Sequence, residues 1–128
     1  MAFSLDTVLG IHPKALELRA RRTELLAQNL ANAETPHYKA RDLDFQSSLK
    51  ESIQTAMPKR THASHLLAPT SPNQDALYRI PLHPSLDGNT VTEEFEKTAF
   101  SENAVRYQAS LMFLTRKFSA LKGAMNDQ

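Results

Sequence analysis

The fold is decided by residues 90–125, which read TVTEEFEKTAFSENAVRYQASLMFLTRKFSALKGAM. Apolar residues recur in this stretch with a strict 4-3-4-3 spacing, which is the a/d repeat of a coiled coil sustained for more than three heptads. We call these positions the C-terminal seam: Phe100, Ala104, Tyr107, Leu111, Leu114, Phe118, Leu121 and Met125. The seam predicts one long helix over residues 90–128, which would span about 50 Å between Thr92 and Met125.

The start of this helix carries N-terminal signals. Thr90, followed three residues later by Glu93, predicts a capping box. Asp87-Gly88-Asn89 is typical of a tight turn that delivers the chain into the helix. Two acid–base pairs at i,i+4 spacing support the same helix, Glu93–Lys97 and Glu102–Arg106.

A second helical arm is predicted over residues 1–32, because apolar residues recur there at steps of three and four. Pro13 either opens the main helix in its first turn or kinks a longer one. Three arginines make part of this arm cationic, and they either form a solvated face or meet acidic groups of a partner; they are Arg19, Arg21 and Arg22. The apolar stripe of the arm includes Leu5, Leu9, Leu16, Leu26 and Leu30.

The middle, residues 33–89, is irregular and rich in proline, since only Pro13 of the seven prolines lies outside residues 36–84. A short helix is predicted at about 44–57 with Asp44 as its cap, and residues 77–82 could be extended. The sequence therefore predicts a single, mainly α domain over residues 1–128. Its two long terminal helices form a coiled-coil-like pair, and the seam is either their shared core or a surface for neighbouring copies.

Composition argues against catalytic classes. The 128 residues contain no cysteine and only three glycines, which excludes thiolate metal sites and leaves little room for a glycine-rich phosphate loop. His62 and His65 form an H-x-x-H pair, but no acidic residue stands at ligand spacing, so we expect surface histidines. We therefore predict no catalytic residue, cofactor, metal or small-molecule substrate.

Charge and hydropathy exclude further classes. Fifteen basic against fourteen acidic residues, a net charge of +1, do not favour binding to nucleic acid. The start, MAFSLDTVLG, lacks the basic region of a signal peptide, and no apolar run of membrane-spanning length follows. Neither a cleaved signal peptide nor a membrane span is predicted.

The segment NLANAETPHYK, residues 29–39, follows the first arm. The helix is expected to end at Asn32, and Pro36 favours extended geometry in the residue before it. This segment resembles the signature N-[LI]-A-N-x-x-T-x-G-Y-K of flagellar rod, hook and hook-filament axial proteins. The residues of this sequence that carry the motif are Asn29, Asn32, Thr35, Pro36, Tyr38 and Lys39.

Two further stretches sharpen the resemblance to the flagellar basal-body rod protein family, and within it to proximal-rod subunits. They are KARDLDF at residues 39–45, and YRIP at 78–81 with PSLDGNTV at 84–91, which contains Asp87, Gly88 and Asn89. The family usually has glycine where this sequence has His37. This departure leaves open whether the backbone at residue 37 has a positive φ.

The resemblance implies a structural role. Such subunits polymerise through their terminal helices into the proximal rod, a drive shaft that connects the membrane ring and export gate to the distal rod and is needed for flagellum assembly and motility. The implied partners are neighbouring copies, the rod protein FlgC, the adaptor FliE, the export gate and the membrane ring. The implied location is the rod within the periplasm, reached by flagellar type III export without signal cleavage.

The apolar stripe of the first arm and the C-terminal seam are then the expected assembly surfaces. Phe45 and Leu49 also match an F-x-x-x-hydrophobic pattern that early export substrates of the family present to the export gate. Packing at i,i+4 on the short helix explains this pair equally well. The rival interpretation of the whole chain is a soluble helical adaptor or export chaperone that binds one partner helix.

Overall fold

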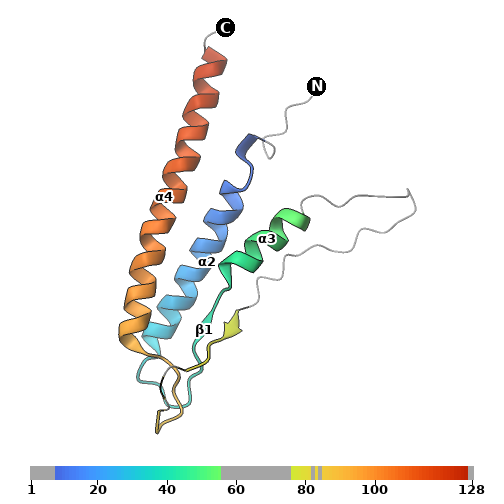
Figure 1. Ribbon diagram of the computed structural model, residues 1–128. Helices are drawn as coiled ribbons and strands as arrows, with labels where there is room; N and C mark the ends of the chain where they lie inside the picture. The colour runs from blue at the N-terminus through green and yellow to red at the C-terminus, as the bar shows by residue number, and fades with distance from the viewer. Residues whose placement is uncertain (1–7, 56–75, 82, 84, 127–128) are drawn as a thin grey trace, which may run out of the picture.

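The computed structural model of the chain describes residues 8–55, 76–81, 83 and 85–126. Along the chain its elements are α2 (His12–Ala31), β1 (Arg41–Asp42), α3 (Phe45–Thr55), β2 (Leu77–Tyr78) and α4 (Glu93–Asn126). The two long helices run antiparallel, and α2 lies between α4 and α3 (Figure 1). The predicted mainly α fold is confirmed.

The predicted helix over residues 1–32 is interrupted in its described part, since Val8 and Leu9 are helical but Gly10 and Ile11 form a turn. Gly10 has a φ of 59°, which interrupts the helical path, and α2 begins at His12. Pro13 lies in the first turn of α2, where its missing N–H costs nothing, so it opens the helix and does not kink it. The helix ends with Asn32 as its C-cap, as predicted.

The short elements of the middle follow local signals. The Asp44 carboxylate accepts hydrogen bonds from the amides of Gln46 (3.1 Å) and Ser47 (3.2 Å), so Asp44 caps α3 as predicted. Part of the predicted extended segment 77–82 forms β2, which pairs antiparallel with β1. The last residues of the predicted helix, 56 and 57, lie outside the described residues.

Helix α4 confirms the predicted long C-terminal helix but not its predicted cap. The residue before α4 is Thr92, whereas the Thr90 hydroxyl accepts a hydrogen bond from the amide of Ala40 (2.8 Å). The capping box at Thr90 is therefore wrong, because the loop after α2 uses that hydroxyl. Both expected acid–base pairs form, Glu93–Lys97 and Glu102–Arg106.

The apolar core is small and lies on the side of α2 that faces α3. Leu18 and Leu25 of α2 pack with Leu43, and all three are buried. Each fully buried leucine contributes about 1.5–3 kcal/mol. Phe45 and Leu49 of α3 are partly buried against this cluster. This cluster is therefore formed by α2, α3 and the residue Leu43 that precedes α3, while Leu26 of α2 and Ala99 of α4 are buried outside it.

Candidate assembly surface

The face of α4 that meets α2 coincides with only part of the C-terminal seam. The buried residues of α4 are small or polar: Glu96, Ala99, Asn103 and Ser110. Residues 99, 103 and 110 each precede a seam residue by one position, and one residue turns an α-helix by about 100°. Part of the seam is therefore rotated to the flank of the helix pair, where Leu111, Phe118 and Met125 are exposed, whereas Tyr107 and Leu114 follow Asn103 and Ser110 by four residues and lie near the inward face.

Polar side chains join the two long helices. The Asn103 amide donates to the carbonyl of Arg19 (3.0 Å) and to the hydroxyl of Thr23 (2.9 Å). Arg19 in turn donates through Nε to the hydroxyl of Ser110 (3.0 Å). Because these directional bonds match one register only, they set how α2 and α4 align.

The eight seam residues all lie in the described part of the chain, and none of them is fully buried. Leu111 is 45% exposed, Phe118 48% and Met125 78%, whereas the other five are half-buried. Further large apolar side chains lie exposed elsewhere on α4, namely Val105, Met112 and Phe113. The helix thus presents much more apolar surface than α2 covers, which is typical of an interaction surface.

The residues of the apolar stripe predicted on the first arm differ in how deeply they are buried. Leu9, Leu16 and Leu30 are half-buried, so part of each is accessible. Leu26 is completely buried, and its assignment to an assembly surface is therefore wrong. Leu5 lies outside the described residues.

A buried ionic network ties α4 to the strands and α2. The Glu96 carboxylate has no exposed surface, pairs with the guanidinium of Arg79 and accepts a hydrogen bond from Asn29 (3.2 Å). Arg79 also pairs with Asp42 (2.7 Å), which in turn receives two hydrogen bonds from Arg22 (2.9 Å each). Two carboxylates and two guanidinium groups therefore compensate each other inside the fold.

The arginines of the first arm find partners within the chain. Arg22 binds Asp42, and Arg21 pairs with Glu24 at 2.7 Å. The guanidinium carbon of Arg19 lies 4.3 Å from the ring centroid of Phe45, a cation–π contact. Two alternatives were open for these three arginines, a purely solvated face or a contact with acidic groups of a partner. Neither describes them in the folded chain.

The motif residue Asn29 is buried and binds the backbone of β1. Its amide nitrogen donates to the carbonyl of Arg41 (2.8 Å), and its oxygen accepts from the amide of the same residue (3.1 Å). Asn32 closes α2 by donating to the carbonyl of Gln28 (2.8 Å) and accepting from Thr35 (3.1 Å). The motif asparagines therefore satisfy backbone groups at the helix end.

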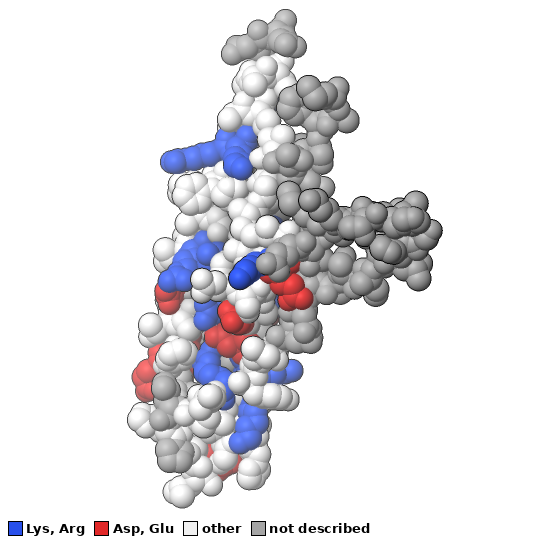
Figure 2. All heavy atoms as spheres, turned by 45° about the vertical axis from the view of Figure 1, so that its right-hand side comes forward, with Lys and Arg blue, Asp and Glu red and all other residues white. Residues whose placement is uncertain are grey.

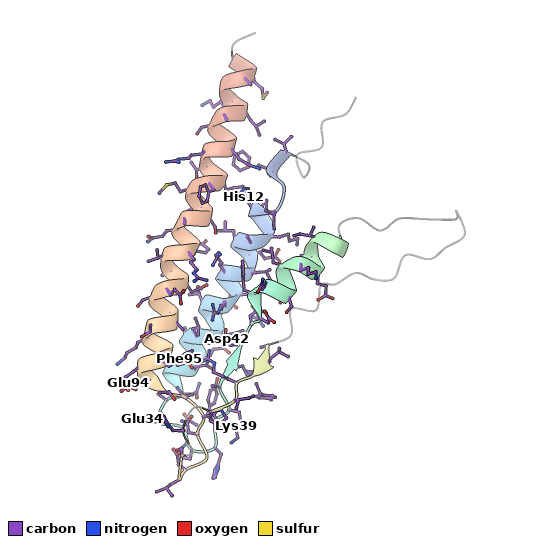
Figure 3. All side chains as sticks on the ribbon, in the orientation of Figure 1. His12, Glu34, Lys39, Asp42, Glu94 and Phe95 are labelled. Atoms are coloured by element: carbon purple, nitrogen blue, oxygen red, sulfur yellow. The ribbon has the colours of Figure 1, made fainter. Side chains whose placement is uncertain are left out.

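The rest of the motif lies in two loops at the base of the helix pair, where Figure 3 labels Glu34 and Lys39 below the first turn of α4. Lys39 donates to the carbonyl of Gly88 (2.7 Å), and Pro36 is exposed. Tyr38 is half-buried and donates to the Asn29 oxygen at 3.4 Å. Both segments of the resemblance therefore meet in space.

Asn89 stands where these loops join. It is 5% exposed, and its amide nitrogen lies within hydrogen-bond distance of the carbonyl oxygens of Asn32 (3.1 Å), Ala33 (2.7 Å) and Thr35 (3.0 Å). Its oxygen accepts from the amide of Val91 (2.8 Å). Asn89 thus connects the C-terminal end of α2 to the start of α4.

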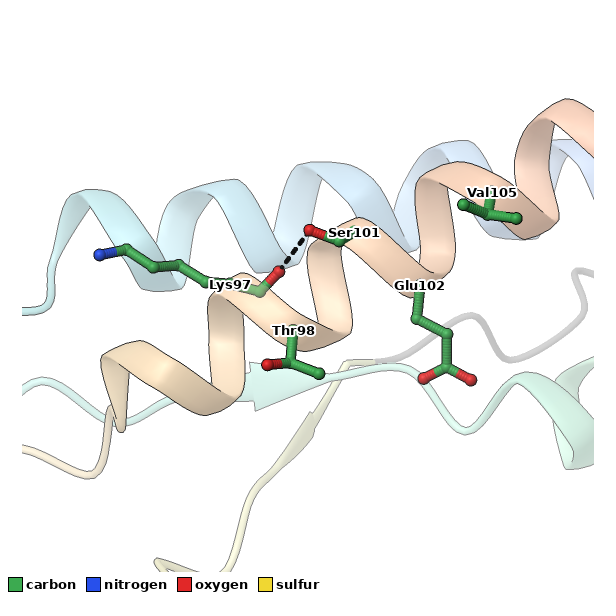
Figure 4. Close-up of a pocket in the computed structure, with 5 residues that line it drawn as sticks. All are labelled: Lys97, Thr98, Ser101, Glu102 and Val105. Carbon is green, nitrogen blue, oxygen red and sulfur yellow. Dashed lines mark hydrogen bonds between the residues drawn. The ribbon is translucent and has the colours of Figure 1, made fainter.

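The described surface offers no built ligand site. The depression in Figure 4 is a shallow, open groove on α4 between Lys97 and Val105, where Ser101 donates to the Lys97 carbonyl (2.9 Å). No group of three metal-binding side chains occurs among the described residues, and His62 and His65 lie outside them. Within the same residues, no helix is long and apolar enough to cross a membrane.

Charge on the face shown in Figure 2 is mixed, with basic and acidic side chains interspersed. This pattern lacks the continuous basic stripe of a nucleic-acid interface. It agrees with the net charge of +1.

Comparison with known proteins decides the family. The chain is 46% identical to the flagellar basal body rod protein FlgB of Cereibacter sphaeroides, over 94% of both chains. It is 45% identical to FlgB of Salmonella typhimurium, over 95% of this chain and 93% of that protein. The chain belongs to the FlgB family. FlgB of Escherichia coli K12 is 44% identical over 98% of this chain and 96% of its own length, whereas no family model matches the chain.

Membership in the FlgB family makes this chain a structural subunit of the bacterial flagellar basal body rod. This conclusion agrees with the exposed apolar surface on the described residues of α4.

His37 keeps the backbone conformation that glycine would adopt. Its φ is 62°, in the left-handed region that side chains disfavour by about 1–2 kcal/mol. The amide of His37 donates to the carbonyl of Asp87 (3.0 Å), and this bond holds the residue in place.

We predict that His37→Gly raises the free energy of unfolding by about 0.5–1 kcal/mol, because the relief of backbone strain exceeds the added entropy of the unfolded chain. Thermal unfolding measures this as a higher Tm. Pro36→Ala in the same loop serves as a comparison without a positive φ. A lower Tm for His37→Gly would contradict the interpretation.

Asp42 makes stability depend on pH. Burial raises the pKa of this carboxyl, but the hydrogen bonds and charge of Arg22, with the Leu43 amide and Arg79, outweigh burial and leave the pKa below its ordinary value. A lowered folded pKa stabilises the fold above the unfolded pKa of about 4, and this stabilisation is lost as pH falls through the folded pKa.

We therefore expect Asp42→Asn to cost roughly 2 kcal/mol at neutral pH. The difference from the wild type should shrink as pH falls below about 4, because the carboxyl of the unfolded wild-type chain is then protonated, and it should be smallest below the lowered folded pKa, where the folded carboxyl is protonated as well. Urea unfolding at a series of pH values tests this. A difference that stays constant down to pH 2 would contradict an ionic role for Asp42.

Sequence reasoning missed the buried network. Asp42 and Arg79 belong to the stretches KARDLDF and YRIP that carry the family resemblance, but neither these stretches nor any motif predicts that they pair, and Glu96 belongs to no motif. One signal was present for Glu96: it precedes Ala99 and Asn103 at steps of three and four, so all three share one face of the helix. Nothing local identifies Arg79, because its partners are 17 and 37 residues away.

Proposed function

We propose that this chain polymerises through its terminal helices into the proximal segment of the rod. The observation that carries the proposal is the C-terminal seam, which is regular over its whole length and yet is only partly covered, since Leu111, Phe118 and Met125 are exposed. A regular apolar stripe that its own chain buries only in part is suited to a neighbour. Different patches on the two arms give heterologous contacts, which build an open helical assembly and not a closed oligomer.

The same proposal names the assembly surface. It comprises the accessible parts of Leu9, Leu16 and Leu30 on α2 and the seam of α4. Long packed helices also suit a shaft that transmits torque, because packed interiors resist deformation. Residues 1–128 act as one rod-subunit domain in this proposal.

The finer details come from the family resemblance. The neighbours are further rod proteins, including FlgC, together with the adaptor FliE, the export gate and the membrane ring. The subunit reaches the periplasm through flagellar type III export without cleavage of a signal peptide. The rod is required for flagellum assembly and motility, so loss of the chain removes both.

The decisive experiment is a density map of basal bodies from cells that carry only this chain as their FlgB-family subunit. The chain should occupy the rod beside the membrane ring, with α4 seams against neighbouring helices. A soluble adaptor or chaperone predicts a discrete dimer or heterodimer in solution and no density in the rod, which would overturn the proposal.

The export motif is the second question. Phe45 and Leu49 both pack on the core cluster in the folded chain, and the Phe45 ring also meets Arg19. If the pair acts in export, it does so before folding, when the side chains are free.

We predict that Phe45→Ala lowers the free energy of unfolding by about 2 kcal/mol, since the lost ring is partly buried, and impairs rod assembly while secretion continues. Immunoblots of secreted and basal-body fractions measure the two steps. Ile53→Ala on the exposed side of α3 is the control. Loss of secretion in Phe45→Ala alone would instead favour a contact with the export gate.

A further inference from the structure

Two loops far apart in the sequence lock together at the base of the helix pair. One follows α2 and the other precedes α4, and both lie at the bottom of the molecule in Figure 1. Besides the contacts of Asn89 and Lys39, the amide of Thr90 donates to the carbonyl of Tyr38 (3.0 Å). The amide of Ala40 donates to the Thr90 hydroxyl, a bond that spans 50 residues.

The loops also fit closely. Gly88 has a φ of 71°, and a Cβ at this position would lie 2.9 Å from the His37 ring nitrogen Nδ1. A side chain at residue 88 would therefore clash as well as strain the backbone. The imidazole of His37 lies over Gly88, where the second loop has no side chain.

The polar side chains of the motif form their hydrogen bonds within the chain. The Asn29 amide binds the backbone of Arg41, and the Asn89 amide binds three carbonyl oxygens on one side and Val91 on the other. The ammonium group of Lys39 donates a hydrogen bond to the Gly88 carbonyl. These groups form directional bonds inside the subunit, so they are poorly suited to serve as contacts between subunits.

The helix pair needs such a lock. The described α4 face toward α2 is small and polar, and the leucine core lies on the other side of α2. Polar bonds of Asn103 and Arg19 therefore contribute to aligning α2 and α4. Hydrogen bonds at the base add to them, because they define where α4 starts and in which direction it leaves.

We propose that the two loops form an intrachain latch in which Asn89 is the central positioning residue, and that the motif shared with axial proteins acts within each subunit to aim the C-terminal seam at its neighbours. The latch rests on the proposed function, since aiming matters only for a subunit that assembles through α4. It assigns to Asn89 a role in assembly without any contact to a neighbouring copy.

The first test measures the latch in the isolated full-length chain. The sequence contains no cysteine, so cysteines introduced at the exposed residues Ala20 of α2 and Gln108 of α4 carry the only spin labels. The wild-type background should give one narrow distance distribution. Asn89→Ala should broaden it toward longer distances, with the open population raised about tenfold or more, because the hydrogen bonds from the Asn89 amide to the carbonyls of Asn32, Ala33 and Thr35 are lost.

Two further variants separate the hydrogen bonds from space filling. Asn89→Asp keeps the shape and the acceptor for Val91 but turns an oxygen toward the three carbonyls, so it should open the pair at least as far as Asn89→Ala. Leu86→Ala changes a fully exposed side chain of the same loop and should leave the distribution unchanged. Circular dichroism should report wild-type helix content throughout.

If Asn89→Ala does not fold, Lys39→Met provides a milder form of the test. It removes one exposed hydrogen bond to Gly88 and should widen the distribution less than Asn89→Ala would. An unchanged distribution in Lys39→Met would overturn a latch that extends to this residue.

The second test uses cells. Asn89→Ala should be secreted at the wild-type level but recovered from purified basal bodies at least tenfold less. A wild-type distance distribution in Asn89→Ala would overturn the latch, whether or not the variant assembles. If assembly is lost while the distance distribution stays that of the wild type, Asn89 contacts a neighbouring subunit. Normal assembly of an opened variant would also overturn it. If the proposed function itself fails, the wild-type chain will be missing from basal bodies too.

Discussion

Replacing Leu111 by Asp is expected to abolish incorporation of the subunit into the rod while the isolated chain stays folded. Leu111 is 45% exposed in the monomer, so the new carboxylate remains in water and the free energy of unfolding changes by less than about 0.5 kcal/mol. Under the proposed function, a neighbouring helix covers the same position in the rod. Burying an unpaired carboxylate costs about 3 kcal/mol or more, which lowers incorporation at least a hundredfold.

Three measurements check this expectation: thermal unfolding of the purified variant, immunoblots of secreted protein, and swimming in soft agar. Gln108→Asp introduces the same charge on the same helix at an exposed position that is already polar and lies outside the seam. It should swim normally. Normal motility of Leu111→Asp would contradict an assembly role for the seam, and an unfolded variant would contradict the exposed position of Leu111.

The largest effect on folding is expected at Glu96. Its carboxylate is completely buried, and Glu96→Ala leaves Arg79 and the Asn29 amide without this partner. Breaking one side of a buried ion pair costs roughly 3–5 kcal/mol. This is a large part of the total stability of a domain, which is about 5–15 kcal/mol.

Urea unfolding of Glu96→Ala, Glu96→Gln and Glu94→Gln distinguishes the charge from the helix position. Glu96→Gln keeps an acceptor oxygen and should cost less than Glu96→Ala. Glu94 lies in the same first turn of α4 but is exposed, and Figure 3 shows both Glu94 and Phe95 at this end of the helix. Equal effects of the two glutamine variants would mean that the network around Arg79 does not stabilise the fold.

The glutamate network also bears on the latch. Asn29 belongs to both, since it binds β1 and Glu96 at once. Substitutions at Glu96 and Asn89 should therefore couple, so that the double variant loses less stability than the sum of the two single variants.

Local patterns in the sequence predicted most of the helical elements. The helix that begins at Glu93, the end of α2 at Asn32 and the cap at Asp44 were all within reach, because each depends on neighbours within four residues. Where the prediction failed, a distant group had intervened. Thr90 is not a cap because its hydroxyl accepts a hydrogen bond from the amide of Ala40, 50 residues earlier.

The residues of the candidate site could be predicted from the sequence, but their arrangement in space could not. The seam and the motif can be recognised by spacing and resemblance. That Leu26 is internal, and that Arg79 and Glu96 meet, could not be recognised, because such contacts depend on how separate elements pack.

The sequence by itself determined that this chain has two long helical arms, a regular apolar seam and the motif of a flagellar rod family, because helix periodicity and motif spacing are properties of the chain alone. Only the tertiary structure decided which face of α4 meets α2. A difference of one residue turns the helix by about 100°, and polar bonds from Asn103 and Ser110 select the small, polar face over the apolar one. The seam is left only partly covered for that physical reason, with Leu111, Phe118 and Met125 exposed.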